Sequence, residues 1–240
     1  VPARVEVDET RIARIGAPVS GRLTDLDAVV GQSVRRGQVL ATLNSTELSN
    51  AQLAFLKADS QRQLAERAAA RAVQLLDADV IGSAELQRRQ VDLAQAEAEV
   101  SAARGQLRVL GMSDGSIAKL AASRTVNSIA AIASTLAGTV IERKVTEGQV
   151  VQPADVAFLV ADLSRLWIVA DIPEQAAGAV RVGESVDAEI AALPGRRFTG
   201  QLGFVAPTVN SETRTVRARM DLANPAGEAK PAMLATVVIR

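Results

Sequence analysis

Apolar residues recur at alternating spacings of three and four along the stretch from Leu48 to Leu76. Read in sevens, one column holds Leu48, Phe55, Arg62, Ala69 and Leu76, and the column three residues later holds Ala51, Ala58, Ala65 and Ala72. This spacing brings the apolar positions onto one narrow stripe of a helix, with Arg62 as its one polar break. The pattern predicts a long helix that packs along this stripe.

A second stretch repeats the pattern. Its columns hold Leu86, Leu93, Val100 and Leu107, and Arg89, Ala96, Ala103 and Leu110. Only residues 77–83 separate the two stretches, and no proline occurs between Pro18 and Pro153. We expect an antiparallel coiled-coil hairpin, roughly 40–45 Å long at about 1.5 Å per residue. Its helices start at Ser45 or Thr46 with Glu47, and at Ser83 with Glu85. The alternative is a hairpin packed lengthwise on a globule, but the narrow stripes favour a projecting arm.

From Thr139 onward the apolar period falls to about two. Strand-like runs, which include "RLWIVADI", "ESVDAEI", "TVRARMDL" and "ATVVI", are separated by turn signals such as Leu193-Pro194-Gly195 and Asn224-Pro225. Short strands at this spacing are typical of an antiparallel sandwich or barrel. The N-terminal run "ARVEVDETRIARI" alternates as well, so it is expected to pair with this later sheet.

One unit of 23 residues occurs twice, at 21–43 and at 138–160. Both copies begin with glycine, have Gly-Gln ten residues later, and then have valine at matching positions, Val34 or Val151 and Val39 or Val156. Each copy reads as strand, turn and strand, which buries too little apolar area to be stable alone. Two copies facing each other would close a small flattened barrel, with the helical hairpin inserted between the halves.

Composition excludes several kinds of function. Lys+Arg and Asp+Glu both number 27, and aromatic residues make up 2%, which does not fit a nucleic-acid binder. The chain has neither cysteine nor histidine, so thiolate chemistry and the usual general base are missing. No apolar run reaches the length of a membrane-spanning helix, and the start "VPARVEVDE" lacks the pattern of a secretory signal. Trp167, the only tryptophan, is expected in the barrel core.

No catalytic or cofactor-binding constellation stands out. "GQSVRRG" and "VRVGES" lack the spacing of a phosphate-binding loop. A lipoyl or biotinyl carrier would display a lysine between its two halves, and "TLNSTEL" has none. The three methionines, Met112, Met220 and Met233, are scattered and are expected to fill cores rather than hold a soft metal ion. We therefore expect no enzyme activity, no cofactor and no metal site in these residues.

Several stretches together resemble one family. They include "APVSGRLTDLDAVVGQSVRRGQVLATL", "GTVIERKVTEGQVVQP", "ADLSRLWIVADIPE" and "KPAMLATVVI", and the resemblance covers nearly the whole chain. The chain resembles the periplasmic adaptors, or membrane fusion proteins, of the HlyD-like family. The stretch "LRVLGMSDGSI" is similar to the heavy-metal branch (CzcB/CusB-like), whose pumps belong to the resistance-nodulation-division class.

The resemblance implies a modular fold of mixed α and β structure. It consists of a split lipoyl/biotinyl-like β domain (12–45 and 129–161) that carries the antiparallel α-helical coiled-coil hairpin (46–112, tip about 77–83). A connector (113–128) and an antiparallel β-barrel domain (1–11 and 162–240) complete it. Family members continue into a membrane-proximal domain that uses both termini, and we expect that domain to be largely absent here. Ala232 stands where the family usually has a glycine.

The resemblance also implies a function. Such adaptors lie in the periplasm of Gram-negative bacteria, associated with the inner membrane. They bridge an inner-membrane resistance-nodulation-division transporter and an outer-membrane TolC-type channel, and they self-associate into a ring, expected to be a hexamer. The cargo expected for this branch is heavy-metal cations. Three alternatives stay open: the same architecture serving drug efflux or type I secretion, a biotinyl or lipoyl carrier subunit, and a stand-alone coiled-coil scaffold.

Candidate contact residues follow from matching the family pattern at the hairpin tip. Arg71 and Leu75 fit its Arg and Leu positions, whereas its serine position falls on Gly82, one residue before Ser83. Val80 and Ile81 are apolar residues in a turn and are interpreted as further contacts with the channel. The alternatives are a solvated charge for Arg71 and loop packing for the apolar pair.

In the barrel, Arg214 within "SETRTV" matches a position that recurs in the family. The resemblance implies that it contacts the pump or a neighbouring adaptor. The alternative is an edge charge that pairs with Glu212 or Asp221.

Overall fold

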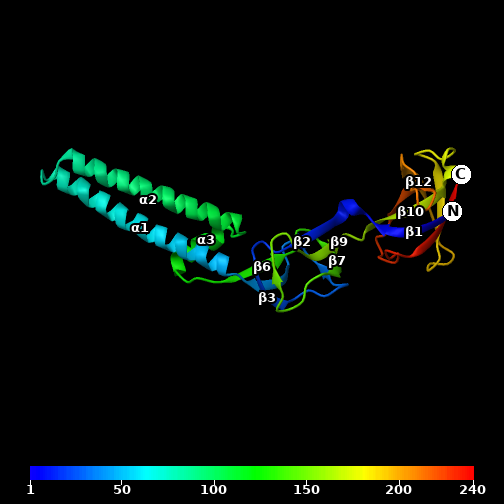
Figure 1. Ribbon diagram of the computed structural model, residues 1–240, viewed down its shortest axis with the longest axis horizontal. Helices are drawn as coiled ribbons and strands as arrows, with labels where there is room; N and C mark the ends of the chain where they lie inside the picture. The colour runs from blue at the N-terminus through cyan, green and yellow to red at the C-terminus, as the bar shows by residue number, and fades with distance from the viewer.

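The computed structural model describes residues 1–240 and shows three parts in a row (Figure 1). A helical arm forms one end, a small pair of β-sheets lies in the middle, and a closed six-stranded barrel forms the other end, where both termini lie. This arrangement confirms the expected mixed fold with a split β domain, a projecting hairpin and an antiparallel barrel. The residue boundaries given to the domains remain predictions. None of the helices is long and apolar enough to cross a membrane.

The arm consists of two antiparallel helices, α1 (Thr46–Asp77) and α2 (Ser83–Val109). The predicted stripes face each other, since the buried apolar residues come from them: Leu48, Phe55, Ala58, Ala69, Ala72, Ala96, Val100 and Leu107. Ser45 caps α1 by accepting the backbone N–H of Leu48 at 3.2 Å, as expected. The second helix begins at Ser83, as expected; its N-cap is Gly82, which makes no side-chain capping bond.

The middle part has two four-stranded sheets. One has the order β2-β9-β7-β4 (Ile12–Gly16, Val156–Ala161, Gly138–Arg143, Ser33–Val34), and the other has the order β6-β5-β3-β8 (Ile129–Ala133, Val39–Asn44, Gly21–Leu26, Val150–Val151). The strands β7, β8 and β9 begin and end 117 residues after β3, β4 and β5. The short strand of each half pairs with the first strand of the other half, β4 with β7 and β8 with β3. The repeated unit is therefore needed twice to build one module.

The Gly-Gln step of each repeat explains why glycine recurs there. Gly31 and Gly148 both have a left-handed backbone, with φ of 90° and 78°. Their N–H groups cross to the other half, from Gly31 to the carbonyl of Val140 at 2.8 Å and from Gly148 to that of Leu23 at 3.0 Å. The turn thus positions each short strand against its partner half.

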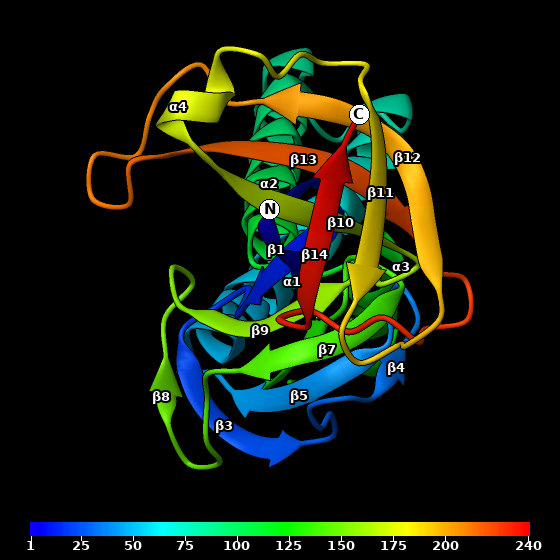
Figure 2. The ribbon, with the colours of Figure 1, turned by 90° about the vertical axis from the view of Figure 1, so that its right-hand side faces the viewer.

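The barrel closes in the order β1-β10-β13-β12-β11-β14 (Pro2–Val7, Arg165–Pro173, Thr215–Ala223, Arg197–Val205, Ser185–Ile190, Leu234–Ile239). Figure 2 shows it from the end that holds the termini, with α4 (Glu174–Ala177) at its side. The N-terminal run divides between modules. A short 3₁₀ turn (Glu9–Arg11) separates β1 from β2. As expected, β1 pairs with β10 and β14 of the barrel. By contrast, β2 pairs with β9 of the middle part.

Trp167 does not lie in the barrel core, which corrects the prediction. The alternate residues of β10 that fill the core are Leu166, Ile168, Ala170 and Ile172. Trp167 points to the other side of the strand, where the guanidinium of Arg219 covers its ring at 3.8 Å from the centroid. Trp167 is only 9% exposed. Arg219 covers its ring, so this side chain is buried by a cation–π contact and not by the barrel core.

Candidate docking site at the tip of the helical arm

The tip of the arm is a tight turn that completes the end of α1. The N–H of Val80 donates to the carbonyl of Leu75 at 2.8 Å, and the N–H of Asp79 donates to that of Leu76 at 2.9 Å. Asp79 has φ of 58°, so this pair of bonds is a Schellman motif with aspartate in the left-handed position. The motif reverses the chain in five residues, 78–82, before α2 begins.

The structure gathers the predicted tip residues at this end of the arm. Leu75 lies in the last turn of α1, Val80 and Ile81 form the turn, and Ser83 is the first residue of α2. Val80 is 66% exposed, while Leu75 and Ile81 are half-buried. Arg71 lies one turn before Leu75 with its side chain exposed, and it takes part in none of the ion pairs or side-chain hydrogen bonds of the structure. The tip therefore offers an apolar surface with a free positive charge beside it, and its role in docking remains a prediction.

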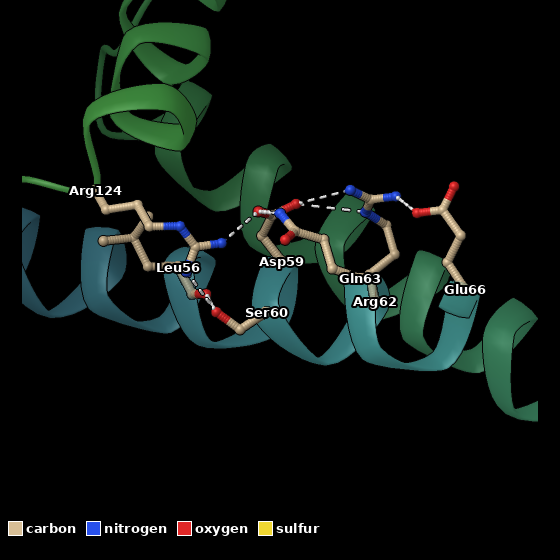
Figure 3. A network of polar contacts seen from close by, with 7 residues as sticks. All are labelled: Leu56, Asp59, Ser60, Arg62, Gln63, Glu66 and Arg124. Carbon is tan, nitrogen blue, oxygen red and sulfur yellow. Dashed lines mark hydrogen bonds and ion pairs between the residues drawn. The ribbon is translucent and has the colours of Figure 1, made fainter. Parts of the chain in front are cut away.

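A polar network near the middle of α1 was not foreseen from the sequence. The carboxylate of Asp59 is nearly buried and accepts hydrogen bonds from Arg62 at 3.2 Å, Gln63 at 2.8 Å and Arg124 at 3.4 Å (Figure 3). Arg124 also donates to the hydroxyl of Ser60 at 2.9 Å. The hydrogen bonds to Asp59 raise the pKa of the Arg62 guanidinium above its ordinary value. The network explains the one polar break in the α1 stripe, because Arg62 is held by an ion pair.

Gln52 makes a second contact to the same connecting segment. Its side-chain amide donates to the carbonyl of Asn127 at 2.9 Å and accepts from the N–H of Asn127 at 2.8 Å. Gln52 and Asp59 are seven residues apart, and so both lie on one side of α1 and both are buried. The segment that follows α3 (Asp114–Ser123) is thus attached to α1 at two positions, Gln52 and Asp59. No signal in the sequence indicated this anchor, because the burial of both polar residues depends on a segment far away in the chain.

The link between the middle part and the barrel has its own ion pair. Arg11 lies between β1 and β2 and contacts Asp162, between β9 and β10, at 2.6 Å. The backbone N–H of Ser164 donates to the other carboxylate oxygen at 2.9 Å. The Ser164 hydrogen bonds and then the charge of Arg11 lower the pKa of Asp162 below its ordinary value. The two chain crossings between these modules are therefore tied to each other.

Arg214 lies on an exposed turn of the barrel. Its side chain is 76% exposed, and its one ion pair is with Glu174 at the start of α4, at 3.6 Å. The expected alternative partners, Glu212 and Asp221, are wrong. A pair this exposed contributes little to stability, so it leaves Arg214 available for another contact.

The chain gathers no group of three or more His, Cys, Asp or Glu side chains that could hold a metal ion. Met112 packs against the core at the base of the arm, whereas Met220 and Met233 pack in the barrel, so the three thioethers belong to two separate cores. A cleft of about 750 Å³ opens at the base of the arm, lined by Gln52, Met112, Lys119 and mostly small or apolar residues. The lining also holds Ser113, Ser116 and Ser123; the hydroxyls of Ser113 and Ser116 lie 2.9 Å from each other, and none of the three serines is hydrogen-bonded to Lys119.

The architecture defines a class of protein: a membrane fusion protein, with a hairpin arm inserted into a split β module that is followed by a β-barrel. Models of two protein families match most of the chain. The CzcB-like barrel-sandwich hybrid domain matches residues 11–162, and the CusB-like beta-barrel domain matches residues 165–240. The chain therefore belongs to the membrane fusion proteins of the heavy-metal branch of resistance-nodulation-division efflux systems.

Individual relatives are named as efflux or export proteins. The cation efflux system protein CzcB of Alcaligenes sp. (strain CT14) is 25% identical over 236 residues, which are 98% of this chain and 44% of the relative. The macrolide export protein MacA of Yersinia pestis is 28% identical over 239 residues, 94% of this chain and 63% of the relative. This chain thus spans less than two thirds of the length of these curated relatives.

Solved structures share the fold. ZneB from Cupriavidus metallidurans superposes with a TM-score of 0.72 at 26% identity, covering 99% of this chain and 95% of that chain. A MacA-MexA chimeric protein that contains the Pseudomonas aeruginosa MexA α-hairpin domain gives 0.70 at 23% identity, covering 100% and 78%. The second match supports the fold alone. Membrane fusion proteins are a non-enzymatic class.

Proposed function

We propose that this chain is the central part of a periplasmic adaptor that joins an inner-membrane resistance-nodulation-division transporter to an outer-membrane TolC-type channel. The observation that carries the proposal is the arm. The 32 residues of α1 extend about 48 Å at about 1.5 Å per residue, and the arm ends in an apolar tip beside a free arginine. A structure that projects so far from its own cores is suited to reach a second protein, and membership of the membrane fusion family supports a channel as that partner.

The parts have separate roles in this proposal. Arg71, Leu75, Val80 and Ile81 contact the helical ends of the channel, with Ser83 at the edge of that contact. The middle sheets of neighbouring copies lie side by side in a ring of six. The barrel, with Arg214 on its exposed turn, contacts the transporter or a neighbouring adaptor. The chain performs no chemistry; it assembles and seals the pump in the periplasm, at the inner membrane.

The proposed cargo is heavy-metal cations. Two relatives that are each 25% identical to this chain are named for cation efflux and for cobalt-zinc-cadmium resistance, which supports this cargo. The second candidate is drug efflux, because MacA proteins of similar identity are named for macrolide export. The matched family models belong to the CzcB and CusB branch and favour the metal.

Growth of a strain that lacks this gene tests the proposal. We expect selective sensitivity to one or two metal salts across a panel of metals and antimicrobials, and restoration by the wild-type gene. Sensitivity to macrolides or other drugs alone would overturn the metal cargo and leave the adaptor. A covalently modified lysine in the intact mass would instead indicate a carrier subunit.

A further inference from the structure

The cleft at the base of the arm has no role in the proposed adaptor function. It lies where residues of α3 and of the middle sheets line a common space, and its volume is about 750 Å³. Figure 1 shows α3 beside the base of the arm, with the segment after it leading to β6. Small-molecule sites in proteins usually have volumes of about 300–1,000 Å³. The cleft is therefore large enough to receive a small organic molecule.

One wall of the cleft is a polar side of α3. Ser113, Ser116, Lys119 and Ser123 follow one another at intervals of three or four residues, so they lie on one side of the helix. The hydroxyl of Ser113 caps the helix by accepting the backbone N–H of Ser116 at 3.2 Å. This wall therefore presents hydroxyl groups and one amine along about three turns of α3.

The wall formed by the middle sheets is apolar. Ile129, Ala131 and Ala133 are alternate residues of β6 and so lie on one side of the strand, and Val39 of β5 pairs with Ala133. Ile129 is 55% and Val39 is 38% exposed. Two large apolar side chains are thus open to solvent within a concave surface, and an apolar wall opposed by a few polar groups is typical of a ligand site.

The charge of the cleft comes from one residue. Lys119 is the only charged side chain among the 19 lining residues, and it takes part in none of the ion pairs or side-chain hydrogen bonds of the structure. Asp114, the other charged residue of α3, is paired with Arg108 at 2.7 Å. No carboxylate lines the cleft, whereas hard metal cations are held by carboxylate and other oxygen ligands. The cleft is therefore suited to an anion and not to a metal cation.

We propose that this cleft binds a small amphiphilic organic acid. Its carboxylate accepts hydrogen bonds from the ammonium group of Lys119 and from the hydroxyls of Ser116 and Ser123. Its apolar body lies against Ile129 and Val39, which removes both side chains from water. A ligand in this position touches both α3 and β6, so its binding is expected to slow hydrogen exchange in both elements. The inference goes beyond the proposed adaptor function and does not depend on it.

Calorimetric titration of the purified full-length protein with decanoate tests the proposal. We expect saturable binding at one site. Decanol, which has the same chain without the charge, is expected to bind about three- to fivefold more weakly, as for loss of an exposed ion pair. Acetate, which has the acid group without the chain, is expected to show no binding. Hydrogen-exchange mass spectrometry is expected to show slower exchange in residues 113–123 and 129–133 when decanoate is present.

Variants of the two walls locate the ligand. Lys119→Gln is expected to lower the affinity for decanoate about three- to fivefold and to leave the affinity for decanol unchanged. Ile129→Asp is expected to lower the affinity for decanoate at least about tenfold, because it removes apolar contact and adds a like charge. Neither matched control lines the cleft: Lys57→Gln changes another exposed lysine, and Val150→Asp changes a strand residue that is 54% exposed. Both controls are expected to bind decanoate like the wild type.

The proposal is overturned by an absence of saturable decanoate binding, by equal binding of acetate or decanol, or by wild-type affinity in either wall variant. Slower exchange in residues 113–123 that appears without decanoate and increases with protein concentration would indicate a second copy in the cleft, and would overturn it as well. Channel capture is measured with the same protein. If the wild-type protein captures the channel and binds no decanoate, the inference is wrong and the adaptor function stands.

Discussion

At the scale of single residues, four non-glycine residues adopt a left-handed backbone: Asp79, Arg124, Arg214 and Ala232. Three of them lie in the tip turn, the Asp59 network and the exposed barrel turn. Ala232 has φ of 68°, and its N–H donates to the carbonyl of Val5 at 2.8 Å. This hydrogen bond to β1 holds the backbone of Ala232 in the left-handed conformation. The backbone geometry gives a physical reason for glycine at this position, where alanine stands in this chain.

Ala232→Gly is predicted to stabilise the barrel. Relief of the left-handed strain outweighs the extra chain entropy of glycine and is expected to raise the free energy of unfolding by about 0.5–1 kcal/mol. Urea denaturation with circular dichroism measures the change. Ala226→Gly, in the same loop but without a positive φ, serves as control and is expected to be neutral or destabilising. A lower free energy of unfolding in Ala232→Gly would contradict the inference that the backbone is strained at Ala232.

At the scale of elements, the attachment of α1 to the segment after α3 depends on Asp59. Its carboxylate is nearly buried and has three donors, two on α1 itself and one beyond α3. The arrangement joins the start of the arm to the segment that leads back into the middle sheets. Burial makes the charge costly without its partners, so the donors and the carboxylate depend on each other.

Asp59→Ala is predicted to lower the free energy of unfolding by about 3 kcal/mol, because Arg62 and Arg124 then lose their shared acceptor. Hydrogen exchange is expected to rise in the first turns of α1 and in α3, while the tip is unchanged. Asp59→Asn retains one acceptor oxygen and is expected to lower the free energy of unfolding by a smaller amount. Glu66→Ala, which removes only the exposed partner of Arg62, is the matched control and is expected to cost under about 1 kcal/mol. Equal effects of Asp59→Ala and Glu66→Ala would refute the anchor.

Elements with a regular period could be predicted from the sequence. The two helical stripes, the strand runs and the duplicated unit each express one local rule, and the structure confirms them. The predictions that failed concern residues whose surroundings are determined by a partner far away in the sequence. Trp167 alternates like a strand residue, but Arg219 on a neighbouring strand determines how it is buried. The anchor at Asp59 depends on Arg124, 65 residues away, which no local period can indicate. The tip residues were placed by family resemblance, and their contacts belong to a partner.

At the scale of the whole molecule, the barrel and the middle sheets are joined by only two chain crossings. Arg11 and Asp162 lie on these crossings and bond to each other, both through their side chains at 2.6 Å and through the N–H of Asp162 to the carbonyl of Arg11 at 3.0 Å. This double tie limits how freely the two modules can turn relative to each other. It also makes the junction sensitive to the charge of one carboxyl group.

The tie is predicted to weaken in acid. The pKa of Asp162 is lowered in the folded protein, so its stabilising contribution is complete above its ordinary value of about 3.9 and is lost as the pH falls below it. Asp162→Asn is therefore expected to lower stability at pH 7, with a difference from wild type that shrinks at pH 3. Urea midpoints at the two pH values measure it, with Glu147→Gln in an exposed turn as control. A difference that grows in acid would contradict the assigned sign.

The most direct test of the adaptor account is capture of the outer-membrane channel by the tagged full-length protein from its own cells. We predict that Leu75→Asp combined with Val80→Asp abolishes co-purification of the channel, while the transporter still co-purifies and the circular dichroism spectrum is unchanged. Val182→Asp, an equally exposed valine on the barrel, is the control and should leave channel capture intact. Undiminished capture by the double variant would contradict the tip as the docking site, and absence of any channel with the wild-type protein would contradict the adaptor function itself.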